Sequence, residues 1–356
     1  MSTSPSSPPA VYRVALVMIA RDEAARIERA LASFAPFVDE CVVLDTGSRD
    51  DTASRAQRAG ARVEHFQWVD DFAAARNGAL DAARADWHVV VDADEWLADG
   101  GAAIAALRQQ APTFVGSVRV DSDDDATALA TRTSSWISRV LPGALRYAGR
   151  VHEQPVHALA VQRLPIRFGH DGYLGAQRTA KAGRNRALLE AAVQAAPADA
   201  YLHYQLGKDH DVYERYAEAL DAFARAEALL GSRLPTWCHD LAVRRLHALK
   251  RCGRHAEGLQ CAEHELGRWG ESPDFFFALG DLLLDWAADE PARAGELLPL
   301  IESAWQRCLA LGERPDLEGA VAGRGSHLAA ANLVLLYEQL GQPELAAPYR
   351  PLLAPA

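Results

Sequence analysis

The sequence predicts a Rossmann-like α/β domain with a mostly parallel sheet, followed by an all-α domain. In roughly the first half, short β-branched runs alternate with segments of helical spacing. From about Thr179 onward the chain is rich in Ala and Leu and shows no convincing strand. Ligands of parallel α/β sheets bind beyond the carboxyl ends of the strands, so the residues following each strand are the first to consider.

The strand and helix alternation begins with the buried-strand run Val14–Ile19. A helix over Ala24–Phe34 follows, because its apolar residues recur at helical spacing on one face. Gly60 is placed to end the second helix. The further strands are expected at 41–44, 62–66 and 89–91, and the further helices at 51–59 and 71–84.

The fourth strand run, Val89–Val91, ends in the acids Asp92, Asp94 and Glu95. Side chains two apart on an extended chain face the same way, so Asp92 and Asp94 should project together. Two carboxylates with room left for water and phosphate oxygens suit Mg²⁺ or Mn²⁺ holding a diphosphate. Taken alone, this pattern is better explained by a solvated turn in which Asp94 or Glu95 caps the next helix. The motifs before it favour the metal.

Composition limits the function classes. The chain has 356 residues, enough for about two domains, and a net charge of -11, which argues against a general nucleic-acid surface. Its five cysteines form no C-x-x-C pair, so a reduced, cytoplasmic setting is the simplest interpretation. Residues 1–10 have the composition of a disordered tail and not of a signal peptide. No apolar run approaches the roughly 20 residues that span a bilayer, so no transmembrane segment is expected.

Glycine-rich phosphate loops are missing after the first strand run. Neither G-x-G-x-x-G nor G-x-x-x-x-G-K-[ST] occurs there, so a dinucleotide site and a P-loop are both unsupported. Acids instead follow strands one, two and four, where they could accept hydrogen bonds from a base and a ribose and bind a metal. Arg76 and Asn77, early in the third helix, could donate to a nucleotide.

Four blocks of the first half resemble family 2 glycosyltransferases, which have the GT-A fold, in order and spacing: 16–23, 42–52, 71–77 and 91–95. Later blocks at 150–153, 169–173 and 181–185 are similar to a subgroup with tetratricopeptide-like helices behind the catalytic domain. That subgroup includes enzymes that glycosylate bacteriocin peptides. Arg21-Asp22-Glu23 departs from the usual Lys-Asn-Glu, which puts the contact made by residue 22 in doubt. The acidic pair that often supplies the base in this family is not found in its usual downstream context.

The resemblance implies roles in binding the nucleotide sugar. Asp45 would accept a hydrogen bond from uracil or ribose, and Asp92 would approach the ribose or a metal-bound water. Arg76 would face the phosphates or the base. The alternatives are a turn residue for Asp45 and a solvated helix arginine for Arg76. Three further candidates, each with a solvated or helix-stabilising alternative, are Glu23, Lys181 and Arg184.

Asp94 would bind the metal directly, and His170 is its expected partner. Gly169 and Gly172 flank His170 and let the backbone approach a ligand closely. The alternative for His170 is a buried hydrogen-bonding histidine.

The catalytic base is expected near the acceptor. Direct displacement at the anomeric carbon passes through an oxocarbenium-like state, and a carboxylate can remove the acceptor's proton as the bond forms. Glu153 is the candidate, with His152 as its competitor because imidazole titrates nearest neutral pH. Both could instead be structural. The acidic run Asp121–Asp125 is expected to be a solvated turn.

The second half fits the tetratricopeptide template at its small and aromatic positions, among them Leu206-Gly207, Phe223 and Leu279-Gly280. Three to four helix pairs in a short solenoid are expected. The concave face of such a stack could bind a peptide or protein acceptor or form a homodimer, or the helices could only brace the catalytic domain.

These expectations combine into a domain plan and a function. The plan is a disordered tail at 1–10, a GT-A glycosyltransferase domain at 11–178 and tetratricopeptide-like repeats at 179–356. The resemblance implies an inverting, metal-dependent glycosyltransferase with UDP-glucose or UDP-N-acetylglucosamine as donor and a peptide or protein side chain as acceptor. One alternative is a lipopolysaccharide-core or other saccharide acceptor. Another is an interaction protein whose repeats do the work and whose enzyme domain is degenerate.

Overall fold

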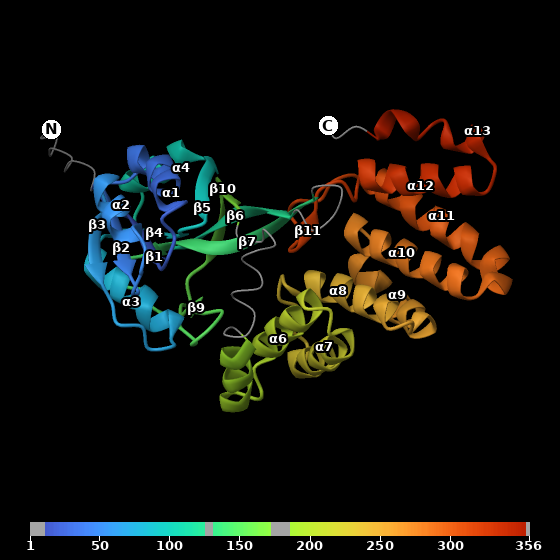
Figure 1. Ribbon diagram of the computed structural model, residues 1–356, viewed down its shortest axis with the longest axis horizontal. Coiled ribbons are helices and arrows are strands. Elements are labelled where there is room, and N and C mark those ends of the chain that lie inside the picture. The colour runs from blue at the N-terminus through green and yellow to red at the C-terminus, as the bar shows by residue number, and fades with distance from the viewer. Residues whose placement is uncertain (1–10, 125–130, 172–185, 354–356) are drawn as a thin grey trace, which may run out of the picture. The chain divides into compact units, whose positions relative to one another are not determined.

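The computed structural model describes residues 11–124, 131–171 and 186–353 (Figure 1). The chain divides into two compact units, one of Met1–Asp123 and Trp136–Lys181 and the other of Asp124–Ser135 and Ala182–Ala356. The expected tail at 1–10 and the expected boundary between 178 and 179 lie outside the described residues, so both stay predictions. Each unit is described separately below.

Four parallel strands form one half of the sheet of the first unit, in the order β3-β2-β1-β4. They are β1 (Val14–Ala20), β2 (Glu40–Asp45), β3 (Arg62–His65) and β4 (Trp87–Asp92). Each comes from a predicted strand run, and the parallel arrangement confirms the expectation drawn from strand and helix alternation. The fold is the GT-A type that the resemblance implies.

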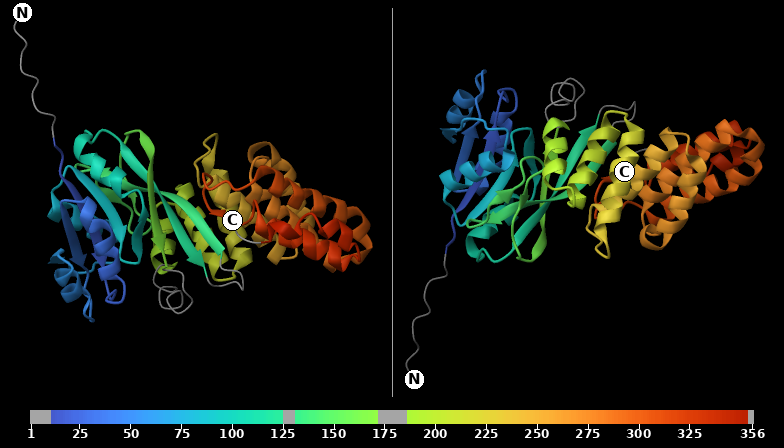
Figure 2. Two further views of the ribbon diagram at one scale, coloured as in Figure 1. Left: turned by 90° about the horizontal axis from the view of Figure 1, so that it is seen from above. Right: turned by 90° about the horizontal axis from the view of Figure 1, so that it is seen from below.

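Helices connect these strands and cover both faces of the sheet, as Figure 2 shows. The connecting helices are α1 (Ile27–Phe34), α2 (Thr52–Arg58) and α3 (Phe72–Ala83), and α4 (Gly101–Ala106) follows later in the chain. Short 3₁₀ turns lie at Ala35–Phe37 and Leu107–Gln109. The Asp71 side chain caps α3 by accepting from the Ala74 N–H at 2.9 Å. Helix α1 begins three residues later than predicted because the preceding backbone is held elsewhere: the Glu23 N–H donates to Thr52 Oγ1 at 2.7 Å.

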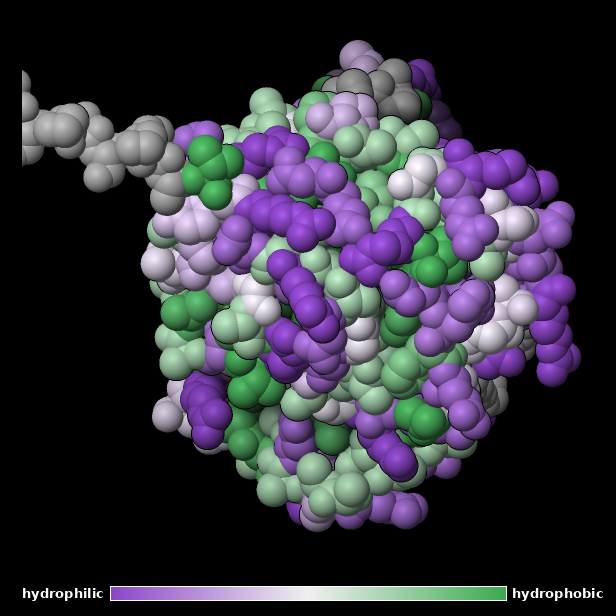
Figure 3. All heavy atoms as spheres, turned by 90° about the vertical axis from the view of Figure 1, so that its left-hand side faces the viewer, coloured by the Kyte–Doolittle hydropathy of each residue, from purple (hydrophilic) through white to green (hydrophobic). Residues whose placement is uncertain are grey.

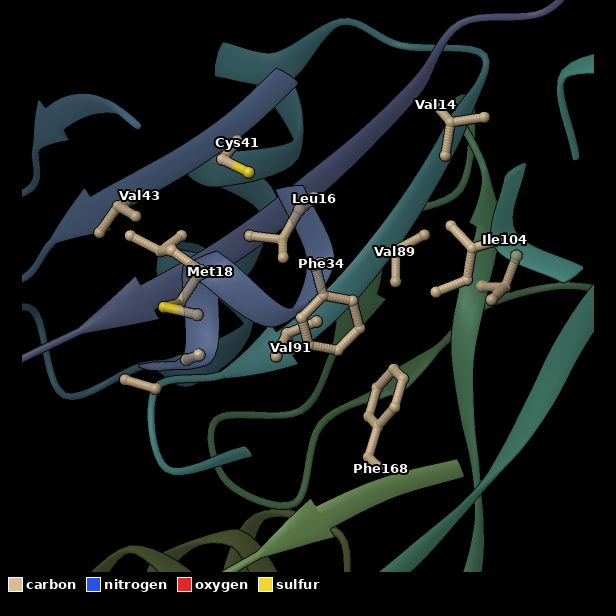
Figure 4. Packing of buried hydrophobic residues seen from close by; sticks show 14 of the residues in the cluster. Val14, Leu16, Met18, Phe34, Cys41, Val43, Val89, Val91, Ile104 and Phe168 are labelled. Carbon is tan, nitrogen blue, oxygen red and sulfur yellow. The ribbon is translucent and has the colours of Figure 1, made fainter. Parts of the chain in front are cut away.

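The core lies on both sides of the sheet because alternate residues of each strand point to opposite faces. On one face, Leu16, Met18 and Val91 pack against α1, and Figure 4 shows Phe34 beside them. Phe34 meets Phe168 edge to face, with ring centroids 5.0 Å apart. On the other face, Val17 and Val90 pack against α3. Continuous apolar runs are therefore required, since both faces of these strands are buried.

The sheet continues in the order β4-β7-β6-β10-β5. These strands are β5 (Glu95–Asp99), β6 (Val115–Asp124), β7 (Thr131–Pro142) and β10 (Val161–His170), and a separate small sheet pairs β8 (Tyr147–Ala148) with β9 (Gln154–Pro155). The expectation of a solvated turn beginning at Asp121 was wrong. Asp121 is buried in β6, opposite Gly169, and accepts from Arg119 Nη2 at 2.9 Å. Pairing with β10 overrides the polar composition of this run.

The second unit contains four consecutive helix pairs among its described residues, in agreement with the expected tetratricopeptide-like repeats. The helices of these pairs are α6 (Ala200–Val212), α7 (Tyr216–Leu230), α8 (Cys238–Arg251), α9 (His255–Trp269), α10 (Pro273–Asp289), α11 (Ala294–Leu311), α12 (His327–Gln339) and α13 (Pro343–Ala346), with 3₁₀ turns at Pro291–Arg293 and Arg350–Leu352. Residues 186–195, which precede them, are also helical. Small residues sit where helices touch: a Cβ at Gly207 would lie 2.4 Å from the Phe223 ring. The small residue of the repeat pattern is therefore needed at Gly207 because a side chain would collide with Phe223.

One strand of this unit was not expected. β11 (Ala320–Val321) pairs antiparallel with Ser134 and Thr133 of β7, all within the second unit. The Asp274 carboxylate supports it by accepting the Val321 N–H at 2.9 Å. A two-residue strand has no periodicity of its own, so only tertiary pairing reveals it. Of the helices described in either unit, none is both long and apolar enough to cross a membrane.

Candidate functional site

The candidate site lies at the carboxyl ends of β1, β2 and β4. Ala20 pairs with Asp45 of β2, and Ile19 pairs with Asp92 of β4. The two acids therefore end neighbouring strands on either side of β1. Topology brings together side chains that lie 47 positions apart in the sequence.

The two carboxylate oxygens of Asp45 have different surroundings: one is used in the turn and the other has no protein donor. Its carboxylate is only 3% exposed. Oδ1 accepts the N–H groups of Gly47 at 2.8 Å and Ser48 at 2.9 Å, which shapes the turn. Oδ2 is buried and has no hydrogen-bond partner. A buried carboxylate oxygen without a donor is costly, so this atom is suited to accept a hydrogen bond from a bound ligand.

Arg76 of α3 joins two acids. Its Nη2 donates to Asp92 Oδ1 at 2.9 Å, and its Nε donates to Glu153 Oε1. The side chain is buried, and its third nitrogen, Nη1, has no hydrogen-bond partner. Two of the three guanidinium nitrogens of Arg76 thus donate to protein carboxylates, and the third can donate to a ligand.

Arg139 of β7 binds the second oxygen of Asp92, the one that Arg76 does not contact. Its Nη2 donates to Asp92 Oδ2 at 2.6 Å and to Glu95 Oε1 at 2.7 Å. The other oxygen of Glu95 accepts the Asp92 N–H at 2.9 Å. Neither Arg139 nor Glu95 was among the predicted site residues. No local motif marks Arg139, and the only signal was general: acids buried at a strand end need a cation nearby.

This group of charges sets the protonation of its members. Burial by itself would raise the pKa of Asp92, but the charges and hydrogen bonds of Arg139 and Arg76 outweigh burial and hold that pKa well below its ordinary value. Burial raises the pKa of Glu95 to about 7, against the opposing charge of Arg139 and with a further rise from the charge of Asp92. Asp92 is therefore firmly ionised at neutral pH.

Asp94 and His170 come together at the same edge. Asp94 is 7% exposed, and its Oδ2 lies 3.6 Å from Nε2 of His170. Strand pairing explains the proximity, because His170 lies opposite Glu95 where β10 meets β5. Ser122 Oγ lies 3.0 Å from His170 Nδ1 and orients the ring. Burial lowers the pKa of His170, but the adjacent Asp94 carboxylate outweighs burial and raises it above the ordinary value.

The donor set at Asp94 and His170 fits a divalent cation that takes its remaining ligands from a substrate. Within the described ranges, no three His, Cys, Asp or Glu side chains cluster so as to enclose a metal ion. One carboxylate and one imidazole leave most coordination positions for phosphate oxygens and water. Mg²⁺ and Mn²⁺ bound with nucleotides are commonly held in this way.

Glu153 and His152 lie between β8 and β9. The Glu153 side chain is 8% exposed and bound to Arg76, whereas His152 is exposed and adopts a left-handed backbone conformation, with φ of 49°. Asn77 fixes the segment against α3, since its amide exchanges two hydrogen bonds with the Tyr147 backbone, at 3.0 and 2.8 Å. The two predicted base candidates therefore differ in environment: one is buried and paired, and the other faces solvent.

The segment after β1 is mainly a structural turn in the described residues. Glu23 accepts from Arg26 Nη1 at 3.0 Å. Asp22 adopts a left-handed conformation, with φ of 56°, and its Oδ1 accepts the Arg49 N–H at 2.7 Å. Asp and Asn both adopt this conformation and both offer that oxygen, so Asp22 can replace the family's usual Asn. Lys181 and Arg184 lie outside the described residues.

A second unpredicted ion pair ties α1 to the end of β10. Asp171, next to His170, lies 3.2 Å from Arg26 Nε and 2.6 Å from Arg29 Nη2. The Arg29 guanidinium also stacks over Trp96, 4.1 Å from the ring centre. Outside this network, charged side chains are distributed among apolar ones over the face of the first unit shown in Figure 3.

Comparison with known proteins assigns the first unit to a family. Residues 15–157 match the sequence model of glycosyl transferase family 2. The SPbeta prophage-derived glycosyltransferase SunS of Bacillus subtilis is 25% identical over 214 residues, which cover 57% of this chain and 50% of that protein. A tetratricopeptide repeat-containing protein of Synechococcus elongatus is 56% identical over 88 residues, 25% of this chain and 22% of that protein. Residues 15–157 therefore form a family 2 glycosyltransferase domain, and the chain spans half or less of these two curated relatives.

Solved structures that are similar to parts of the chain include the following two. The glucosyl-3-phosphoglycerate synthase of Mycobacterium tuberculosis, solved with Mn²⁺, UDP and glucosyl-3-phosphoglycerate, is 26% identical, with a TM-score of 0.26 over 34% of this chain and 50% of that one. MamA is 15% identical, with a TM-score of 0.37 over 49% of this chain and 90% of that one.

Proposed function

We propose that this family 2 domain transfers a sugar from a UDP-linked donor, UDP-glucose or UDP-N-acetylglucosamine, to a peptide or protein side chain with inversion at the anomeric carbon. The observation that carries the donor site is the Asp94 and His170 pair, 3.6 Å apart at the strand end that also presents Asp92. A divalent cation bound there would neutralise the charge of the diphosphate as UDP leaves.

The chain's own residues have separate proposed roles at the donor. Asp45 offers its free Oδ2 to an N–H of uracil or a ribose hydroxyl. Asp92, about one third exposed and held ionised by two arginines, faces the ribose. Arg76 offers its free Nη1 to the nucleotide. These three contacts would hold the donor so that one face of the anomeric carbon stays open to the acceptor.

The transfer itself needs a base. The acceptor atom forms a bond to the anomeric carbon while the bond to the UDP oxygen breaks, and the acceptor's proton moves to the base. We assign that role to Glu153, whose carboxylate pairs with Arg76. One oxygen of that carboxylate is already engaged by Arg76, so the exposed His152 stays the competing assignment.

The helical unit supports a peptide or protein acceptor over a saccharide. Four consecutive helix pairs follow the glycosyltransferase domain in the described residues, and stacks of this kind present a concave surface to extended chains. A lipopolysaccharide-core or other saccharide acceptor is the alternative, and it would leave the repeats without a role in catalysis.

Calorimetry tests the donor assignment. UDP, UDP-glucose and UDP-N-acetylglucosamine are titrated into the full chain with and without Mn²⁺, and then into Asp94→Asn. We expect binding that Mn²⁺ strengthens and that the substitution weakens. Absence of binding by every donor under both conditions would instead favour the interaction protein with a degenerate enzyme domain. Incubation of the active enzyme with UDP-[¹⁴C]glucose and either a peptide library or oligosaccharides then separates the two acceptor classes.

A further inference from the structure

Arg139 occupies an unusual position for a charged side chain. It lies in β7, an interior strand of the sheet, and is only 6% exposed. One nitrogen, Nη2, donates to Asp92 and to Glu95 at once, while its Nε has no hydrogen-bond partner. Burying a guanidinium is costly, and this one is placed where two acids of the same short segment converge.

Arg139, Asp92 and Glu95 form a closed ring of hydrogen bonds, called the brace below, that holds residues 92–95. Arg139 is bonded to Asp92 at 2.6 Å and to Glu95 at 2.7 Å, and Glu95 is bonded back to the Asp92 N–H at 2.9 Å. Asp94 lies inside this closed loop and points to His170. Both oxygens of Asp92 already accept from arginines, whereas Asp94 lies against His170.

We propose that Arg139 is a positioning residue for the donor site, which fixes the 92–95 segment so that Asp94 and Asp92 meet a divalent cation and UDP in a single geometry. The inference deepens the proposed function and rests on it. Arg139 is buried behind the acids and acts through them, as groups behind metal ligands generally do.

A purely structural role is the competing explanation, since any buried acid pair needs a counter-charge to fold. The double variant Arg139→Gln/Glu95→Gln separates the two. Above pH 7, where Glu95 is ionised, it removes one positive and one negative charge together, and Asp92 keeps its bond to Arg76. The buried charge stays balanced, but the brace is lost. The single variant Arg139→Gln leaves Glu95 without its cation and is expected to unfold more readily.

The experiment measures thermal unfolding and the binding of Mn²⁺ to the full chain in saturating UDP, for wild type, both glutamine variants and Arg139→Lys. Arg108→Gln is the matched control, because it breaks a 2.8 Å pair with Asp39, the residue that supports the amino end of β1. We expect the double variant to melt near the control while its Mn²⁺ affinity falls by about 10 to 100-fold. Arg139→Lys keeps the charge on a shorter side chain, whose ammonium does not reach the position of Arg139 Nη2, so an intermediate affinity is expected.

Wild-type Mn²⁺ affinity in a folded double variant would overturn the proposal and leave Arg139 as a counter-charge only. Wild-type affinity in Arg139→Lys would overturn it as well, because charge without the bridging geometry would then suffice. If the wild type itself binds neither Mn²⁺ nor UDP, the proposed function fails and this inference fails with it. That result is distinguished by the wild-type titration alone.

Discussion

Asp94 Oδ2 and His170 Nε2 lie 3.6 Å apart although the two residues are far apart in the sequence. The pairing of β10 with β5 brings them together. If this pair binds the cation, Asp94→Asn and His170→Ala should each weaken Mn²⁺-dependent binding of UDP by about 1.4 kcal/mol or more, a tenfold change. Calorimetry checks this, with Asp81→Asn as a control because Asp81 is exposed on α3 and pairs with Arg146. A metal site elsewhere would leave both variants with wild-type affinity.

Asp45 offers a test of the nucleotide contact that leaves the turn intact. Asn at this position keeps the oxygen that accepts from Gly47 and Ser48, but it replaces the free Oδ2 with an NH₂ donor. Asp45→Asn should therefore weaken UDP binding by about 1–3 kcal/mol with little change in melting temperature. The reference variant is Asp39→Asn, which supports the opposite end of the sheet through the Val14 N–H. Equal affinities for UDP in both variants would mean that Asp45 serves only the turn.

The elements of the first unit could be predicted because their signals are local. The strand runs ending at Asp45 and Asp92 are continuous and apolar, and parallel topology places their ends at one edge. The same reasoning predicted that Asp94 and Arg76 lie at this edge. Their chemical roles stay predictions, because no contact with a ligand follows from periodicity.

The missed features all depend on contacts between distant segments. Arg139 reaches Asp92 across two neighbouring strands, and Asp171 reaches Arg29 across the unit. Asp121 enters a strand because β10 pairs with it. Polar sequence alone indicated a solvated turn there, and the pairing with β10 reverses this interpretation.

Two glycines in the helical unit provide a matched pair for the repeat packing. A Cβ at Gly280 of α10 would lie 2.5 Å from the buried Trp305 indole, whereas Gly267 of α9 has no atom within 4 Å of such a Cβ. Gly280→Ala should destabilise the protein by about 1–3 kcal/mol through overpacking. Gly267→Ala should stabilise it by about 0.5–1 kcal/mol, because alanine favours a helix interior over glycine. Urea unfolding, monitored by circular dichroism, measures the free energy of unfolding of both variants. Equal changes in this free energy at the two sites would contradict the packing explanation.

His88 of β4 should make the first unit sensitive to acid. It is 1% exposed, and burial, with a smaller contribution from the charge of Arg146, lowers its pKa to about 4. The unfolded chain binds a proton at His88 below its ordinary pKa of about 6.5, but the folded protein does not until about pH 4. Stability is therefore fully present above pH 6.5 and is lost as the pH falls toward 4, by up to about 3 kcal/mol.

The measurement is the free energy of unfolding in urea at pH 7.5, 6.0 and 5.0 for wild type, His88→Gln and His65→Gln. His88→Gln should be less stable at pH 7.5, because it disturbs the site where His88 Nε2 accepts the Ala85 N–H, but it should lose less stability on acidification. His65 is 74% exposed, so its variant should follow the wild-type pH dependence. Parallel curves for His88→Gln and wild type would mean that the pKa of His88 is the same in the folded and unfolded protein and that other groups cause the acid sensitivity.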